Sequence, residues 1–283
     1  VQTCALPIFY AFKEGNSKVV QDQKSNDLIV NRFQLFNLLS SKMTASEFSY
    51  AGSVLMWVSQ NPRDMPHWMS MGSTPLNESV ISAMQIVPEF KKQNKLQIVN
   101  TVFLTDGEGD SIDSVYNDGP GYKTLRTTKY SLDSLKLVKV VVNVRDPITK
   151  HQVKITDMQS RTAQTTAFVE LMKQRTHCNV MGFYVLSTAE LKKYGRHFFN
   201  NYYEDYNDIN RKFSTEKSLV SERGAFDEYY LIKSDKSSYN DDEDDGVVIR
   251  SKTTKSLVNA FTKYNNNKVV SRSVLNRFIG MIA

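Results

Sequence analysis

A run of β-forming residues that stops abruptly at a group of carboxylates constrains the fold of this chain most. The stretch is VFLTDGEGD, residues 102–110, in which Asp106, Glu108 and Asp110 follow an apolar segment. The apolar character of residues 96–104 is typical of a central strand that is covered on both faces of a sheet. The carboxylates would then lie at the end of a buried strand, where they could hold a positively charged ligand.

Strand and helix patterns alternate along most of the chain. Strands are expected at 9–12, 96–104, 179–186 and 226–233, and helices at 45–59, 75–90, 162–175 and 188–199. This order predicts an α/β fold that is doubly wound and Rossmann-like, with a mostly parallel sheet and helices on both faces. Ligands of such sheets bind beyond the carboxyl ends of the strands, where we expect Asp106 and Thr74.

Two helix starts carry local signals. Thr44 and Glu47 have the spacing of a capping box, and the helix that follows should end at Asn61-Pro62. Thr74 can cap the next helix, with Pro75 at its first position, and Pro88 should kink that helix near its end.

Other segments interrupt the alternation. Residues 18–30 can supply a hairpin partner for 9–12, and residues 113–130 have the composition of a loop. Residues 137–155 contain two β runs around a turn at Asp146, and this predicted hairpin insertion could extend a binding face or shield a sheet edge.

Composition suggests three parts after the N-terminus. The main domain is expected at 9–236, followed by an acidic linker at 237–251 and a helical extension at 252–283. The linker contains the run Asp241 to Asp245, which is typical of solvated disorder.

The overall charge does not by itself indicate a nucleic-acid partner. The net charge is +6, but 30 acidic residues are interspersed with 36 basic ones, which is typical of a solvated surface. No apolar run reaches the roughly 18 to 20 residues of a membrane-spanning helix. Cys4 and Cys178 imply no disulfide framework, so a cytoplasmic location is expected.

The first eight residues, VQTCALPI, have the features of neither a signal peptide nor a natural protein start. They match the in-frame translation of the tail of a common short-read sequencing adapter. We therefore expect residues 1–8 to be an artefact and the natural protein to begin upstream. A natural apolar N-terminal strand is the alternative.

Two motifs together carry a family resemblance. GSTPLNES, residues 72–79, is followed 32 positions after Thr74 by the Asp106 of FLTDGEGD. This pair resembles the second and third loops of a von Willebrand factor A (VWA) domain, in which a Thr and an Asp help to build a metal-ion-dependent adhesion site (MIDAS). Ser73 stands where the family commonly has a second Gly, and the resemblance extends over residues 9–233.

The family's first metal loop, DxSxS, is absent from this chain. In the family the strands are ordered 3-2-1-4-5-6, so the first strand would lie between 9–12 and 96–104. We expect this strand and its helix, about 30 residues, to belong to the part upstream. Without that first strand, we expect either a gap beside strand 96–104 or a direct pairing of strand 96–104 with strand 9–12.

The resemblance implies that Thr74 and Asp106 bind a divalent cation directly or through water. Hydroxyl and carboxylate oxygens suit Mg²⁺ best among the expected ions, with Mn²⁺ or Ca²⁺ as alternatives. Ser73, Glu108 and Asp110 would lie behind these ligands. The alternative for Glu108 and Asp110 is a solvated turn in which the neighbouring glycines provide an unusual φ.

Three functional classes fit these residues. The favoured class is a non-enzymatic, metal-dependent protein-interaction module whose partner supplies an acidic side chain to the cation, because no catalytic constellation accompanies the motifs. Similar VWA proteins occur in tailed bacteriophages and beside MoxR-type AAA+ ATPases, which suggests such a partner and the host cytoplasm. The alternatives are a chelatase-like accessory subunit for cobalt or magnesium insertion into a tetrapyrrole, and a nucleic-acid-binding protein.

The remaining candidates have weaker patterns. His177-Cys178 could contain a thiol nucleophile, but a strand-entry pair is the simpler interpretation. His67 and His197 lack the context of a metal motif. Three tyrosines near Arg211 and Lys212 could stack on nucleic-acid bases, although packing is favoured; they are Tyr202, Tyr203 and Tyr206.

Overall fold

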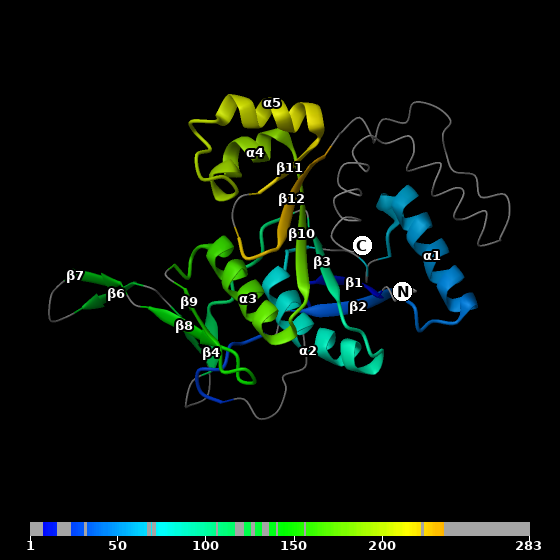
Figure 1. Ribbon diagram of the computed structural model, residues 1–283, viewed down its shortest axis with the longest axis horizontal. Helices are drawn as coiled ribbons and strands as arrows, with labels where there is room; N and C mark the ends of the chain where they lie inside the picture. The colour runs from blue at the N-terminus through cyan, green and yellow to red at the C-terminus, as the bar shows by residue number, and fades with distance from the viewer. Residues whose placement is uncertain are drawn as a thin grey trace. The chain divides into compact units, whose positions relative to one another are not determined.

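The computed structural model is a mixed α/β protein with several small sheets (Figure 1). The described residues are 8–15, 24–30, 33–66, 69, 72–105, 107–116, 122–125, 128–131, 136–139, 141–155, 157–221 and 224–234. The chain divides into two compact units. The first comprises residues 1–97 and 107–177, and the second comprises residues 98–106 and 178–283.

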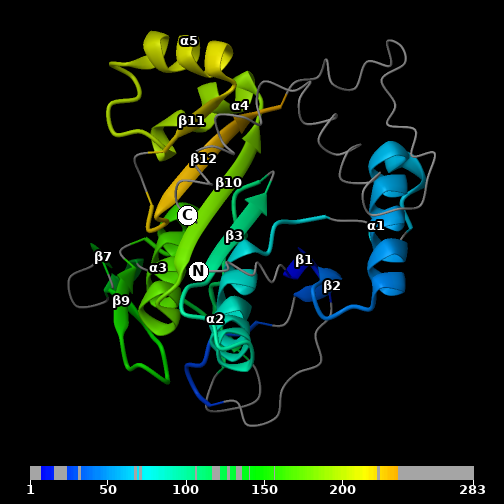
Figure 2. The same cartoon turned by 45° about the vertical axis from the view of Figure 1, so that its right-hand side comes forward.

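The second unit contains the largest sheet, in the order β11-β12-β10-β3 (Figure 2). Strands β3 (Asn100–Thr105), β10 (Asn179–Leu186) and β12 (Glu228–Lys233) are parallel, and β11 (Ser218–Val220) is antiparallel to β12. The predicted strands at 179–186 and 226–233 are thus confirmed, the second with a later start. Parallel neighbours of this kind are the pattern that β-α-β alternation predicts.

An aromatic core lies between this sheet and helices α4 (Thr188–Tyr194) and α5 (Tyr206–Glu216), with η3 (Gly195–His197) between the two helices. Ser187 and Glu190 form a capping box at the start of α4. Gly182 and Gly195 allow the tightest contacts, because a Cβ at either position would lie 2.1 Å from a tyrosine ring, that of Tyr229 or of Tyr202. Helix α5 and strand β11 were not predicted from the sequence.

Strand β3 differs from the strand expected at 96–104. It begins only at Asn100, and among the described residues it pairs with β10 alone, so it is an edge strand rather than a central one. Val102 is 43% exposed and Leu104 is 62% exposed, whereas Phe103 is buried. One face of this strand is therefore covered and the other is open.

Helices α2 (Leu76–Gln93) and α3 (Arg161–Thr176) pack against each other in the first unit. The predicted apolar stripe of α2 is largely confirmed, since Val80, Ala83 and Val87 are buried. The helix continues for five residues beyond Pro88. In α3 the whole predicted stripe is buried; it consists of Ala167, Phe168, Leu171 and Met172.

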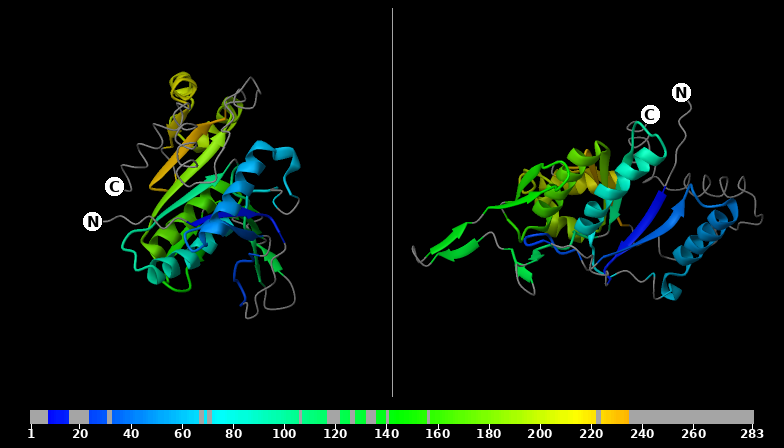
Figure 3. Two further views of the ribbon diagram at one scale, coloured as in Figure 1. Left: turned by 90° about the vertical axis from the view of Figure 1, so that its right-hand side faces the viewer. Right: turned by 90° about the horizontal axis from the view of Figure 1, so that it is seen from below.

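The N-terminal part of the first unit is an antiparallel ribbon of β1 (Ile8–Lys13) and β2 (Gln34–Ser40), drawn in blue in Figure 3. The predicted partner at 18–30 is therefore wrong, because 34–40 takes that place. Helix α1 (Ala45–Gln60) follows with the predicted capping box at Thr44, and η1 (Pro62–Asp64) comes after it.

Three short antiparallel hairpins fill residues 114–155. They are β4 (Ser114–Tyr116) with β5 (Tyr122–Thr124), β6 (Thr128–Ser131) with β7 (Lys136–Lys139), and β8 (Val142–Arg145) with β9 (Gln152–Ile155). The loop predicted at 113–130 is wrong for this reason. The predicted hairpin at 137–155 is shorter in the structure and consists of β8 and β9. Residues 137–139 belong to β7, which pairs with β6 instead.

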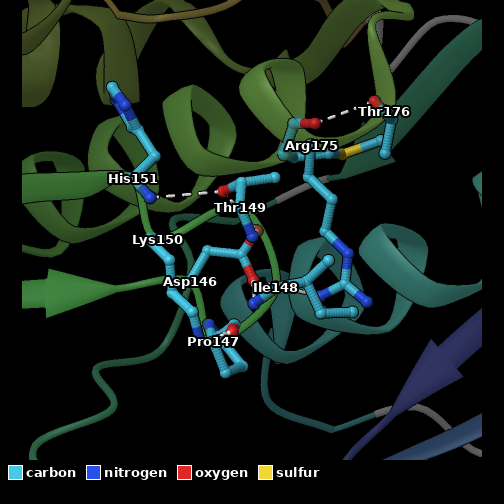
Figure 4. Close-up of polar contacts among 9 residues, drawn as sticks. Asp146, Pro147, Ile148, Thr149, Lys150, His151, Arg175 and Thr176 are labelled. Atoms are coloured by element: carbon cyan, nitrogen blue, oxygen red, sulfur yellow. Dashed lines mark hydrogen bonds and ion pairs between the residues drawn. The ribbon is translucent and has the colours of Figure 1, made fainter.

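The turn between β8 and β9 is tied to helix α3 through Asp146 (Figure 4). Its carboxylate is 3% exposed and accepts hydrogen bonds from the Thr149 hydroxyl at 2.7 Å and from the backbone N–H groups of Ile148 and Thr149. Arg175 of α3 lies 3.3 Å from the same carboxylate. Burial alone would raise the pKa of Asp146, but these donors together lower it below the usual range.

The expected linker at 237–251 and extension at 252–283 lie outside the described residues, as do residues 1–7. Within the part of the chain that the structure describes, no helix combines the length and the apolar character needed to cross a membrane.

Candidate functional site

Two loops that are far apart in sequence are hydrogen-bonded to each other in the first unit. The Thr74 N–H donates to Asp110 Oδ2 at 2.8 Å, and the Asp110 N–H donates to the Thr74 carbonyl at 2.8 Å. Asn77 adds a third bond, because its Nδ2 donates to the Asp110 carbonyl at 2.7 Å. The sequence motifs 72–79 and 107–110 are thus joined at the start of helix α2.

Thr74 enters this arrangement by a route that the sequence did not predict. The Leu76 N–H donates to the Thr74 carbonyl at 2.7 Å across Pro75, whose φ of −75° and ψ of 57° are those of an inverse γ-turn. Pro75 is therefore the N-cap of α2, and the expected cap by the Thr74 side chain is wrong. The Thr74 hydroxyl remains available for another role.

Both glycines of the DGEGD segment allow a close approach of backbone to neighbouring side chains. A Cβ at Gly107 would lie 2.7 Å from Thr74 Oγ1, and a Cβ at Gly109 would lie 3.1 Å from Thr165 Oγ1. Neither glycine has a positive φ, so the unusual backbone conformation considered for this turn is wrong. Gly107 also shows that the Thr74 hydroxyl faces the residue that follows Asp106.

The other predicted site residues are placed as follows. Asp110 and Glu108 are half-buried, and the bonds of Asp110 to Thr74 correct the alternative of a solvated turn. Ser73 is exposed, has a φ of 62°, and donates to Glu14 Oε2 at 2.8 Å. Asp106 lies outside the described residues.

A third acidic residue near the loops, Glu78 in the first turn of α2, was not singled out from the sequence. It is only 7% exposed, and its Oε2 has no hydrogen-bond partner among the described residues. Burial, together with the charges of Asp110 and Glu14, raises the pKa of Glu78 to about 7, although a backbone hydrogen bond acts in the opposite direction. Carboxyl groups with a pKa raised by burial are found most often at functional sites.

No group of three or more His, Cys, Asp or Glu side chains that could hold a metal ion occurs among the described residues, which exclude Asp106. Hydroxyl and carboxylate oxygens, the donors available around Thr74, suit hard divalent cations.

The weaker candidates have structural positions. His177 is the C-cap of α3 with a φ of 49°, and Cys178 is buried with its Sγ 3.4 Å from the Thr101 hydroxyl, as the strand-entry interpretation predicts. His197 lies in η3 at 6.1 Å from the Tyr194 ring, and His67 lies outside the described residues.

The tyrosine cluster belongs mainly to the core of the second unit. Tyr202 is buried and its hydroxyl donates to the Leu191 carbonyl at 2.7 Å, and Tyr206 packs edge-on against its ring. The nearby cations Arg211 and Lys212 both pair with Asp208. Packing is thus the main role of Tyr202 and Tyr206, while Tyr203 is exposed.

No protein-family model, curated protein sequence or solved structure matches this chain.

Proposed function

We propose that the chain is a VWA-type protein-interaction module that binds its partner through a divalent cation. The observation that carries this proposal is the reciprocal pair of hydrogen bonds between Thr74 and Asp110. These bonds hold the Thr74 hydroxyl against the loop that begins directly after Asp106. Thr74 and Asp106 are the ligands that the family resemblance implies.

Two further observations support a VWA-type fold. Ser73 has a φ of 62°, in the left-handed region that favours glycine, and this is where the family commonly has its second Gly. The sheet order β3-β10-β12, all parallel, agrees with strands four to six of the family. Among the described residues the edge of β3 away from β10 has no partner strand, and in the family the first strand lies at that edge.

The oxygen donors around the loops suit a hard divalent cation, with Mg²⁺ preferred and Mn²⁺ or Ca²⁺ as alternatives. The charges of Asp110 and Glu14 both act on the carboxyl group of Glu78 there. A cation close to Glu78 would favour the ionised form of this buried carboxyl. The open position on the cation would accept an acidic side chain of a partner protein, for which an AAA+ ATPase of the MoxR type is the candidate by analogy.

The natural full-length protein tests this function directly. Asp106→Ala, which removes the carboxylate ligand, should abolish measurable Mg²⁺ binding in calorimetry. Thr74→Ala, which removes the hydroxyl ligand, should weaken Mg²⁺ binding by about tenfold. Partner capture should require Mg²⁺ and fail with EDTA. Ser59→Ala, which changes an exposed hydroxyl at the end of α1, is the control. Unchanged Mg²⁺ affinity in both site variants would contradict the proposal.

A further inference from the structure

Helix α3 reaches the two loops through a chain of hydrogen bonds. The Thr165 hydroxyl donates to Asn77 Oδ1 at 2.8 Å, and Asn77 Nδ2 donates to the Asp110 carbonyl at 2.7 Å. Asp110 then exchanges two hydrogen bonds with Thr74. The position of the Thr74 loop relative to residues 107–110 therefore depends on two helix side chains, those of Asn77 in α2 and Thr165 in α3.

This chain of bonds is shielded from water. Asn77 is fully buried and Thr165 is 9% exposed, so neither side chain can exchange its partner for solvent without opening the packing of α2 on α3. A buried polar group that loses its partner costs about 1 to 3 kcal/mol, which favours the connected arrangement. A second buried amide acts on the same segment, since Gln164 Oε1 accepts from the Ile112 N–H at 2.8 Å.

The chemistry of the connection requires an amide at position 77. Asn77 must donate to one carbonyl and accept from one hydroxyl at the same time, and a carboxylate or an apolar side chain can do at most one of these. Gly109 lets the loop lie close to this connection, because a Cβ there would lie 3.1 Å from Thr165 Oγ1 and 3.2 Å from Leu76 Cβ.

We propose that Asn77 is a positioning residue of the cation site, which sets the distance between the Thr74 loop and residues 107–110 and thereby the affinity of the site. This inference rests on the proposed function. Asn77 contributes no ligand atom: both ends of its amide are occupied by Thr165 and Asp110. Helix α3 controls the site through this residue.

The test uses Mn²⁺ binding to the natural full-length protein, followed by the electron paramagnetic resonance of the free ion. Asn77→Leu, which is similar in size and lacks both polar ends, should weaken Mn²⁺ binding by about tenfold or more. Thr165→Val should weaken it by a smaller factor, about threefold, because Asn77 keeps its bond to Asp110. Thr165→Ser, which keeps the hydroxyl, should bind Mn²⁺ with an affinity within about twofold of wild type.

Ser79→Ala is the matched control, because the Ser79 hydroxyl is also buried in α2 but donates only to the Leu76 carbonyl of its own helix. It should leave Mn²⁺ affinity within about twofold of wild type even if it costs stability. If Asn77→Leu does not fold, the comparison of Thr165→Val with Thr165→Ser and Ser79→Ala decides.

The outcomes separate the two proposals. Mn²⁺ binding by wild type that is unchanged in Asn77→Leu and Thr165→Val would overturn the positioning role and leave the proposed function standing. An equal loss of affinity in Ser79→Ala and Thr165→Val would also overturn it, since general loss of stability would then be the cause. A wild-type protein that binds no Mn²⁺ would overturn both.

Discussion

Two buried carboxyl groups of the first unit have opposite surroundings. Asp146 is surrounded by donors: a hydroxyl, two backbone N–H groups and Arg175. Glu78 is nearly as buried, yet its Oε2 has no partner among the described residues and its neighbours Asp110 and Glu14 are also acidic. The pKa of Asp146 is lowered and that of Glu78 is raised to about 7.

The difference separates a carboxylate whose charge is compensated from a carboxyl group whose charge is not. The donors around Asp146 stabilise its charge and fix the β8–β9 turn on α3, so nothing further is needed there. Around Glu78 a backbone hydrogen bond is outweighed by burial and by two acidic neighbours, and buried acids of this kind are found where a protein binds or moves charge. The loops beside Glu78, not the turn at Asp146, are therefore the place to test for a ligand.

The largest expected effect is on Asp146. Asp146→Ala should lower the free energy of unfolding by about 3 to 5 kcal/mol, because it leaves Arg175 and two N–H groups without their partner. Urea denaturation measures the change. Asp157→Ala is the control, since Asp157 is exposed and accepts from the Gln159 N–H, and it should cost about 1 kcal/mol. Equal costs in the two variants would remove the structural role of Asp146.

The next effect is the pH dependence caused by Glu78. In the unfolded chain Glu78 loses its proton near pH 4.5, whereas in the folded chain it keeps the proton up to about pH 7. Because of Glu78 the folded state binds more protons than the unfolded state in this window. The contribution of Glu78 to the free energy of unfolding therefore falls as pH rises from about 4.5 to 7 and changes no further above pH 7. The loss amounts to about 3 kcal/mol for a shift of this size.

Glu78→Gln should remove this loss, because glutamine stays neutral at every pH. With EDTA present, the variant should match wild type near pH 4.5 and exceed its free energy of unfolding by up to about 3 kcal/mol at pH 8. Glu89→Gln, an exposed change on the same helix, should leave the pH dependence as it is. If Glu78→Gln kept the wild-type pH dependence of the free energy of unfolding, the pKa of Glu78 would not be raised in the folded protein.

The smallest effect concerns the glycines. Gly107→Ala should cost about 1 to 2 kcal/mol, because its Cβ would lie 2.7 Å from Thr74 Oγ1 and the hydroxyl must move. Gly52→Ala in helix α1 has no atom within 4 Å of the new Cβ and should stabilise by about 0.5 to 1 kcal/mol. Thermal unfolding measures both changes. Stabilisation by Gly107→Ala would mean that the Thr74 hydroxyl does not face this loop.

Local signals were sufficient for helices α1, α2 and α3. The apolar stripes of α2 and α3 and the capping box at Thr44 depend on residues within a few positions of one another, so the sequence alone predicts them. Strands of three or four residues, such as β4 and β5, are too short for a period to be recognised. Helix α5 was missed because Phe213 is its only buried residue.

The site was predicted only as far as its motifs. The spacing of Thr74 and residues 106–110 predicted two loops, and the bonds between Thr74 and Asp110 agree with that. The roles of Asn77 and Glu78 depend on their burial, which is set by how α2 packs in the folded unit and leaves no trace in the local sequence.

The central claim is that a divalent cation binds beside Thr74 and not elsewhere among the buried carboxylates. Substoichiometric Mn²⁺ added to the isotope-labelled natural full-length protein broadens the amide resonances of nearby residues. We expect the Thr74 and Asp110 resonances to broaden first, while those of Ile148 and Thr149 in the Asp146 turn stay sharp. Broadening at the Asp146 turn, or no selective broadening at Thr74 and Asp110, would contradict the central claim.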